Sequence, residues 1–200
     1  MLYHLLKILF QILFRLVFRA SVEGRENIPK DGRLILAANH MSDADPPLIG
    51  CFFTRPVCYM AKEELFEMPV IGFIIRHCYS FPVHRGAADR AAIKTAVTIL
   101  KKDLVLGIFP EGTRAKNGHM RKAEAGVGLI AAMTGAPVLP AAIVGTDRIF
   151  ANGGFLPKLR VIYGKPMTFT SNRKDKEALE AFSQSILDEI ARMKAPYENQ

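Results

Sequence analysis

The sequence contains no tryptophan and only three cysteines, Cys51, Cys58 and Cys78, which form no C-x-x-C pair and have no histidine at zinc-finger spacing. This count argues against a disulfide framework and a structural zinc site. We expect small, reduced, buried thiols. Acidic residues are also scarce, because 19 Asp and Glu stand against 27 Lys and Arg, a net charge of +8. That balance favours an anionic partner: a phosphate-bearing substrate, an anionic membrane surface or nucleic acid.

Several common motifs are missing. No G-x-S-x-G sequence is present, so the usual hydrolase nucleophile is excluded. The basic residues have little aromatic interleaving and form no nucleic-acid module, which argues against nucleic-acid binding. Gly126–Ala131 resembles a dinucleotide fingerprint, but no strand immediately precedes it. Helix packing through small residues is the favoured interpretation of that stretch.

The first 22 residues predict an amphipathic helix that anchors the chain to a membrane surface. The polar residues of Met1–Arg19 recur at spacings of three or four and form one stripe on a helix, opposite a wide Leu/Phe face: His4, Lys7, Gln11, Arg15 and Arg19. Lys7 and Arg15 interrupt a spanning run, and Phe18-Arg19-Ala20 does not fit a signal cleavage site. Two alternatives stay open: a shallow or spanning insertion, and a soluble packing or oligomer helix.

Residues 23–200 predict a single domain. Glu23–Asp31 is predicted to be a connector. Apolar runs predict strands at Leu34–Ala38, Pro56–Ala61, Ser80–Val83, Leu104–Phe109, Pro137–Val144 and Leu159–Tyr163. Helices are predicted from Asp45 onward and at Glu63–Ile75 (with a break at Pro69), Ala87–Lys102, Glu124–Thr134 and Asp175–Lys194. This alternation indicates an α/β fold with a mixed, partly parallel central sheet flanked by helices.

His40 and Asp45 follow the first of these strands. Polar residues at strand ends are where α/β folds place their chemistry. A spacing of five puts the two on different faces of one helix, so they can meet only if His40 lies in the turn and Asp45 at the helix start. Asp45-Pro46 favours such a start, with Asp45 as the N-cap. The carboxylate could then orient the imidazole as a base. On spacing alone, Asp45 as a simple cap and His40 as a loop histidine remain open.

A second polar stretch, Phe109–Arg114, follows another predicted strand. Gly112 permits a tight turn and close approach to a ligand. Glu111 and Arg114 place charges at the strand end, and Thr113 could cap a turn, although a solvated loop is the alternative. Cations that could meet one phosphate group are Arg85, Arg114, Lys116, Arg121 and Lys122.

The motifs in Asn27–Pro166 resemble, in order, those of the glycerolipid acyltransferases, specifically the bacterial 1-acyl-sn-glycerol-3-phosphate acyltransferases. His40 to Asp45 is similar to the H-x4-D block, and Phe109–Arg114 matches the F-P-E-G-T-R block without a change. Phe81–Gly86 resembles the block that ends in Arg-Gly, although His84 stands where an acidic or polar residue often precedes the arginine. Val138-Leu139-Pro140 resembles the fourth, proline-bearing block.

The resemblance implies transfer of a fatty acyl group from acyl-CoA or acyl-carrier protein to the sn-2 hydroxyl of lysophosphatidic acid, giving phosphatidic acid for phospholipid biosynthesis. His40 would be the base and Asp45 its orienter. Arg85 and Arg114 would hold the acceptor phosphate, while Glu111, Gly112 and Thr113 would shape the glycerol site. Neither a metal nor a bound cofactor is implied, and the anchor helix would place the enzyme on the cytoplasmic face of the inner membrane.

Two other functions remain open. The first is acyl transfer to a different acceptor, such as another lysolipid or an acylated amino acid. The second, of a different class, is a non-catalytic membrane-binding or scaffold protein that keeps the fold.

Overall fold

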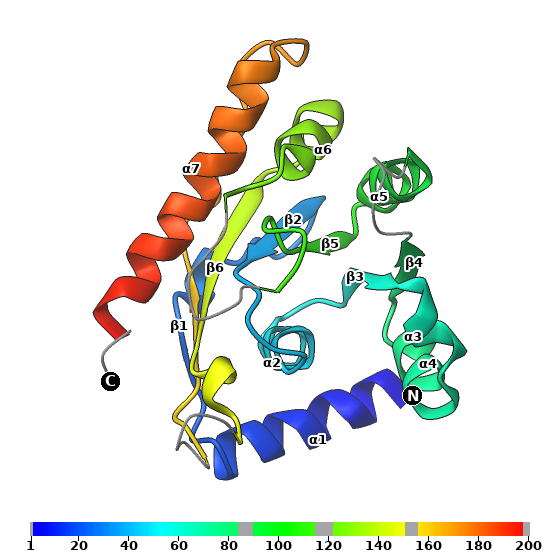
Figure 1. The fold of residues 1–200 in the computed structure, drawn as a ribbon, viewed down its shortest axis with the longest axis vertical. Coiled ribbons are helices and arrows are strands. Elements are labelled where there is room, and N and C mark those ends of the chain that lie inside the picture. Colours follow the sequence, from blue (N-terminus) through cyan, green and yellow to red (C-terminus); the bar gives the residue numbers. More distant parts are fainter. Residues whose placement is uncertain (1, 84–89, 115–121, 151–155, 198–200) are drawn as a thin grey trace.

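A seven-stranded sheet forms the centre of the protein, in the order β1-β7-β6-β2-β5-β3-β4 (Figure 1). The computed structural model describes residues 2–83, 90–114, 122–150 and 156–197. The strands are β1 (Ser21–Glu23), β2 (Leu34–Ala38), β3 (Val57–Lys62), β4 (Phe81–Val83), β5 (Val105–Ile108), β6 (Val138–Val144) and β7 (Arg160–Tyr163). All neighbouring strands pair in parallel except β6 and β7, which are antiparallel. The predicted α/β fold with a mixed, partly parallel central sheet is therefore confirmed.

Helices pack on both faces of the sheet (Figure 1). They are α1 (Leu2–Leu16), α2 (Asp45–Phe52), α3 (Glu63–Glu67), α4 (Pro69–His77), α5 (Arg90–Lys101), α6 (Gly126–Thr134) and α7 (Lys176–Lys194), with short 3-10 helices η1 (Arg25–Asn27), η2 (Thr146–Arg148) and η3 (Ala195–Tyr197). Helices α1 and α2 cover one face, and α5, α6 and α7 cover the other. Helices α3 and α4 lie beside the β3–β4 end of the sheet (Figure 1).

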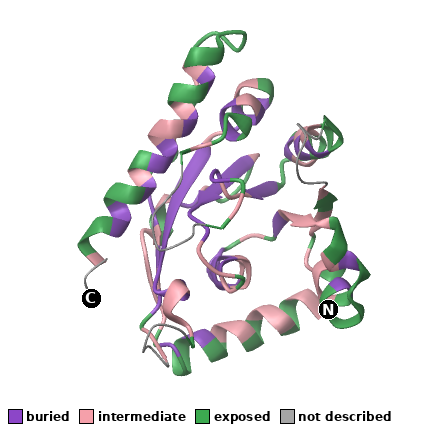
Figure 2. Cartoon of the chain, viewed as in Figure 1, coloured by how far each residue is buried: buried purple, intermediate pink, exposed green. Residues whose placement is uncertain are grey.

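The central strand β2 is buried on both faces because its side chains alternate between the two helical layers. Leu34 and Leu36 pack in the cluster that includes α1 and α2, whereas Ile35 and Ala37 pack in the cluster of α5, α6 and α7. A fully apolar strand is typical of parallel sheets covered on both sides. Figure 2 shows the central strands as the most continuous buried part of the chain. The loop after β2 thus begins at the end of a fully buried strand.

The predicted elements agree with the structure within a few residues, with one omission. Strand β1 (Ser21–Glu23) begins before the predicted connector and pairs in parallel with β7. Its three half-buried residues are too few to show an alternating pattern. The boundary at residue 22 between anchor and domain remains a prediction, and β1 runs across it.

Helix α1 lies on the protein with the middle of its polar stripe turned inward, while His4, Arg15 and Arg19 of that stripe are exposed. Lys7 and Gln11 donate hydrogen bonds to backbone carbonyls at the end of α2, and Phe14 is buried in the core. The apolar residues on the other side are exposed: Leu5, Ile8, Leu9, Ile12, Leu13 and Leu16. Figure 2 shows this exposed side along most of α1. Among the described residues, no helix is both long and apolar enough to cross a bilayer.

Candidate active site

His40 and Asp45 meet at the carboxyl end of β2, as predicted. The Nδ1 atom of His40 lies 2.9 Å from Oδ2 of Asp45. The same oxygen accepts the backbone N–H groups of Met41 at 2.6 Å and Ser42 at 2.8 Å. Asp45 is fully buried, and His40 keeps 9% of its surface exposed. Three donors on one buried oxygen fix the carboxylate, and with it the imidazole.

Asp45 begins α2 as predicted, but its predicted role as N-cap is wrong. Ala44 occupies the cap position without a side-chain hydrogen bond, and Asp45 is the first helical residue. Its side chain turns back toward the loop, because the imidazole and two loop N–H groups compete with the helix N–H groups for the carboxylate. The side chain of His40 is thus bound by the Asp45 carboxylate and not by backbone, which differs from the loop-histidine alternative.

The contact with Asp45 fixes the chemistry of the ring. A carboxylate accepts from Nδ1–H, which leaves the lone pair on Nε2. Within the described part of the chain, Nε2 has no hydrogen-bonding partner. Phe109 lies against the imidazole with ring centroids 4.1 Å apart and planes 19° apart. The imidazole is therefore held in one plane and one tautomer, with its basic nitrogen available to a substrate hydroxyl.

Tyr59, from β3, extends this stack of rings. Its ring is stacked with Phe109 at 6.3 Å. Burial raises the pKa of the Tyr59 hydroxyl well above its usual value. Tyr59 thus stays neutral and supports Phe109 through packing.

Glu111 and Asn39 tie the loop after β2 to its two neighbouring strands. The Oε1 atom of Glu111, a residue only 1% exposed, accepts the backbone N–H of His40 at 3.0 Å. The amide of Asn39 accepts the N–H of Ile143 at 2.7 Å and donates to its carbonyl at 2.9 Å. Because β5 and β6 flank β2, these bonds hold the loop from both sides. Glu111 therefore supports His40 directly, a contact that sequence reasoning did not identify.

Gly112, Thr113 and Arg114 continue from Glu111 at the same edge of the sheet. Gly112 has φ +66°, and a Cβ atom there would lie 2.4 Å from Oε1 of Glu124. Thr113 is half-buried and Arg114 is exposed. The guanidinium of Arg114 pairs with the carboxylate of Asp43, in the loop between His40 and Asp45. The two predicted motifs thus form one continuous site.

Some predicted phosphate ligands cannot be placed. Arg85, Lys116 and Arg121 lie outside the described residues, so their roles remain predictions. Lys122 is exposed. Sequence reasoning overlooked Lys62, the last residue of β3, which the parallel sheet brings to the same carboxyl edge. A cation at the end of a predicted strand was the available signal.

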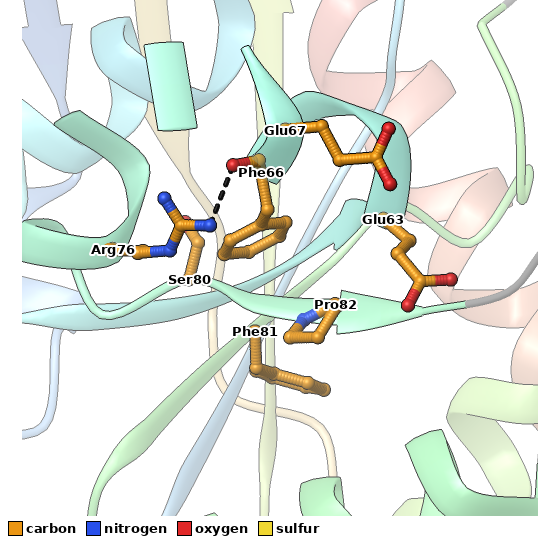
Figure 3. A pocket seen from close by; sticks show the side chains of 7 residues that line it. All are labelled: Glu63, Phe66, Glu67, Arg76, Ser80, Phe81 and Pro82. Carbon is orange, nitrogen blue, oxygen red and sulfur yellow. Dashed lines mark hydrogen bonds between the residues drawn. The ribbon is translucent and has the colours of Figure 1, made fainter. Parts of the chain in front are cut away.

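A separate pocket of about 470 Å³ opens between α3, α4 and β4 (Figure 3). Arg76 in its wall donates to the carbonyl of Phe66 at 2.7 Å and lies over the Phe66 ring. Glu63 and Glu67 add two carboxylates, a charge that disfavours a phosphate ligand. The described residues of its wall include Phe81 and Pro82 from the second sequence block but none of the predicted site residues, so the pocket is distinct from the dyad.

No metal centre is evident in the described ranges, where no three His, Cys, Asp or Glu side chains are grouped so as to hold an ion. Cys51 and Cys58 are buried and Cys78 is half-buried, all as free thiols. This agrees with the expectation of reduced thiols.

The fold and the dyad define an α/β protein with a buried His–Asp pair at the carboxyl end of a parallel strand. A family model described as Acyltransferase matches residues 19–144. The chain is 32% identical over 175 residues to the 1-acyl-sn-glycerol-3-phosphate acyltransferase of Bacillus subtilis (strain 168), covering 84% of this chain and 85% of that protein. It is 32% identical over 181 residues to the protein of the same name from Streptococcus pneumoniae (strain ATCC BAA-255 / R6), covering 87% of this chain and 66% of that one.

A solved structure shows the same fold. The crystal structure of the 1-acyl-sn-glycerophosphate (LPA) acyltransferase PlsC from Thermotoga maritima superposes with a TM-score of 0.80 at 28% identity, covering 99% of this chain and 81% of that one. This chain belongs to the acyltransferase family, and it is an enzyme of that class.

Proposed function

We propose that this acyltransferase transfers a fatty acyl group from an acyl thioester to the sn-2 hydroxyl of lysophosphatidic acid, giving phosphatidic acid. The observation that carries the proposal is the His40–Asp45 contact, with Nε2 directed to no protein partner among the described residues. The names of the two bacterial relatives support the acceptor. Their 32% identity supports the reaction class more strongly than the head group.

The proposed reaction is a direct transfer. Nε2 of His40 takes the proton of the sn-2 hydroxyl as its oxygen attacks the thioester carbonyl. The carbon–sulfur bond then breaks, and the imidazolium returns the proton to the leaving thiolate. Asp45 stabilises the imidazolium, as the carboxylate of a serine triad does, with the substrate hydroxyl in place of serine. No acyl-enzyme intermediate is needed, because the acceptor is itself the nucleophile.

Arg114 is proposed to bind the acceptor phosphate, together with Arg85. A guanidinium presents a planar set of donors that fits a phosphate bidentately. Arg114 reaches toward Asp43, within the loop that carries the dyad, so a phosphate bound there would bring the glycerol backbone near His40. Gly112 and Thr113 would line the glycerol site between them.

The donor is proposed to be acyl-CoA or acyl-carrier protein, without any metal or bound cofactor. Both donors are anionic, and a chain of net charge +8 attracts either one. The thioester already supplies the activation that the reaction needs.

The enzyme is proposed to act at the surface of the inner membrane, on its cytoplasmic face. Support comes from the outward apolar face of α1, including Leu5, Leu9 and Leu16. Val70 and Phe73 of α4 are exposed as well. The rings of Tyr3 and Tyr79 lie 5.3 Å apart, so the start of α1 contacts the segment that follows α4. Two neighbouring apolar surfaces beside a cationic domain fit an interfacial lipid contact.

The decisive test of the chemistry is His40→Ala in the purified enzyme, assayed with a radiolabelled acyl thioester and a panel of acceptors. We expect loss of on the order of 10²–10⁴-fold in kcat, since a general base contributes that much. His77→Ala, at a surface histidine of α4, is the matched control and should keep the wild-type rate. Undiminished transfer by His40→Ala would exclude this base.

The acceptor panel and a lipid-binding assay test the finer assignments. Preference for a non-phosphate acceptor, such as an acylated amino acid, would overturn the assignment of lysophosphatidic acid. A wild-type protein that binds vesicles but transfers no acyl group would favour the scaffold function. Leu9→Gln with Ile12→Gln should weaken vesicle binding by about 10-fold or more, because burial of each side chain contributes roughly 1.5–3 kcal/mol. Unchanged sedimentation with vesicles would contradict the membrane proposal.

A further inference from the structure

The inward face of α1 binds the carboxyl end of the helix that carries Asp45. Nζ of Lys7 donates to the carbonyl of Phe53 at 2.6 Å, and Nε2 of Gln11 donates to that of Cys51 at 2.5 Å. Arg25, in η1, donates to the carbonyl of Phe52 at 3.2 Å. Three consecutive carbonyls at the end of α2 are therefore bound by side chains from the N-terminal 25 residues.

These contacts meet a specific need of α2. The last carbonyls of a helix have no partner within it, and a cation there is favoured by the helix dipole. Helix α2 has only eight residues, or about two turns, a length that is unstable in isolation. Its position therefore depends on tertiary contacts, and Lys7 and Gln11 supply two of them.

The other end of α2 carries the dyad. Asp45 is its first residue, and about 12 Å of helix at 1.5 Å per residue separates it from the end that α1 holds. The flank of α2 is tightly packed as well: a Cβ atom at Gly50 would lie 3.3 Å from the Tyr59 hydroxyl, and the Tyr163 hydroxyl donates to the carbonyl of Ile49 at 3.4 Å. A packed helix moves as a rigid body, so a displacement at its carboxyl end changes the Asp45–His40 distance.

We propose that Lys7 and Gln11 are positioning residues for catalysis: by binding the terminal carbonyls of α2, they keep Asp45 within hydrogen-bonding distance of His40. The inference rests on the proposed roles of His40 and Asp45. It assigns separate tasks to the two faces of α1, since the outward face is proposed to contact lipid and the inward face sets the geometry of the dyad.

The experiment uses the full chain and a short-chain lysophosphatidic acid that stays monomeric in water, so that rates do not depend on vesicle binding. Lys7→Met and Gln11→Leu keep the bulk of each side chain and remove the donor. Arg19→Met is the matched control, because it removes a cation just after α1 that binds the carbonyl of Leu156 rather than α2.

We expect the Lys7→Met, Gln11→Leu double variant to lose about 10-fold in kcat with an unchanged KM for the acceptor, because a misplacement of about 1 Å can cost on the order of 100-fold. Lys7→Arg, which keeps a donor, should recover most of the rate. Arg19→Met should keep the wild-type kcat.

Three outcomes would overturn the inference. One is a wild-type kcat and KM in the double variant at wild-type stability. Another is a lower melting temperature with kcat and KM unaltered, which would leave the contacts with a purely structural role. The third is an equal loss of kcat in Arg19→Met, which would indicate a general effect of charge. A different result would overturn the proposed function itself, namely that the wild-type enzyme transfers no acyl group to the acceptor.

Discussion

The guanidinium of Arg114 forms an ion pair with the carboxylate of Asp43, which lies in the loop between His40 and Asp45. The Asp43 side chain is 85% exposed and that of Arg114 is 49% exposed. An acceptor phosphate bound by Arg114 would therefore share this guanidinium with a carboxylate or displace it. The Asp43–Arg114 ion pair therefore determines the local charge at the position where the acceptor phosphate is proposed to bind.

Asp43→Asn should lower the KM for lysophosphatidic acid by about 2- to 5-fold, because an exposed ion pair is worth roughly 0.2–1 kcal/mol and the substitution also removes a repelling charge. The kcat value should stay the same, since the dyad is intact. Steady-state kinetics at two salt concentrations would measure this, and the gain should shrink at high salt. A higher KM would instead mean that Asp43 holds Arg114 in its binding position.

Asp45→Asn should lower kcat by up to about 10⁴-fold, as the same change does in a serine triad. An amide can donate to Nδ1, which moves the ring proton to Nε2 and removes the basic lone pair. Nitrogen NMR of the His40 imidazole would show the tautomer directly. A normal rate together with the wild-type tautomer would rule out an orienting role for Asp45.

Glu111→Ala and Glu111→Gln should differ in stability. Alanine leaves the buried N–H of His40 without its acceptor, which costs about 1–3 kcal/mol, whereas the oxygen of glutamine can replace the carboxylate. Urea unfolding of both variants would measure the difference. Equal stability of the two would show that this hydrogen bond is not needed to hold the loop.

Gly112→Ala should destabilise the turn by about 1–2 kcal/mol, because the left-handed region is unfavourable for a residue with a Cβ atom. The new methyl group would also press on Glu124 and shift Arg114, which should raise the KM for the acceptor. Gly126→Ala is the matched control, since its Cβ would enter open space at the start of α6. If the two variants behave alike, the conformation of Gly112 does not matter.

Cys51 should make stability depend on pH in the alkaline range. Burial raises the pKa of its thiol from 9.0 to about 12. As pH rises above about 9, the unfolded chain loses this proton while the folded protein keeps it, so the free energy of unfolding falls. Cys51→Ala should reduce the loss of stability measured by urea unfolding between about pH 8 and about pH 10. An identical loss in the variant would mean that other groups cause it.

The place of the dyad could be predicted from the sequence because both of its residues lie close to a strand end, but its pairing was favoured only by the resemblance to the acyltransferase motifs. The apolar runs of β2 and β5 identified the strands, and the spacing from His40 to Asp45 required the turn that the structure contains. The capping role of Asp45 was wrong because capping propensity is a local rule. Here a tertiary partner, the imidazole, competes for the same carboxylate.

The direction of α1 could not be predicted. A stripe of polar residues shows which side chains share a face, but not whether that face meets water, lipid or protein. The partner of Lys7 lies 46 residues away along the chain, and it is a backbone carbonyl that no sequence pattern marks. The pairing of Asp43 with Arg114 was missed for a related reason. The argument from net charge considered only the cations that could bind a phosphate, and it did not consider that a nearby carboxylate could pair with one of them.

The bonds from Lys7 and Gln11 to α2 also fix the roll of α1 about its own axis. A free amphipathic helix can rotate in the plane of a bilayer to suit the lipids around it, but this one cannot turn without losing those bonds. In the proposed bound state, the bilayer therefore sets the orientation of the whole domain. Such an enzyme meets its lipid acceptor by lateral diffusion in the plane of the membrane, with the same side of the domain always facing the lipid. The acyl donor reaches it from the aqueous phase.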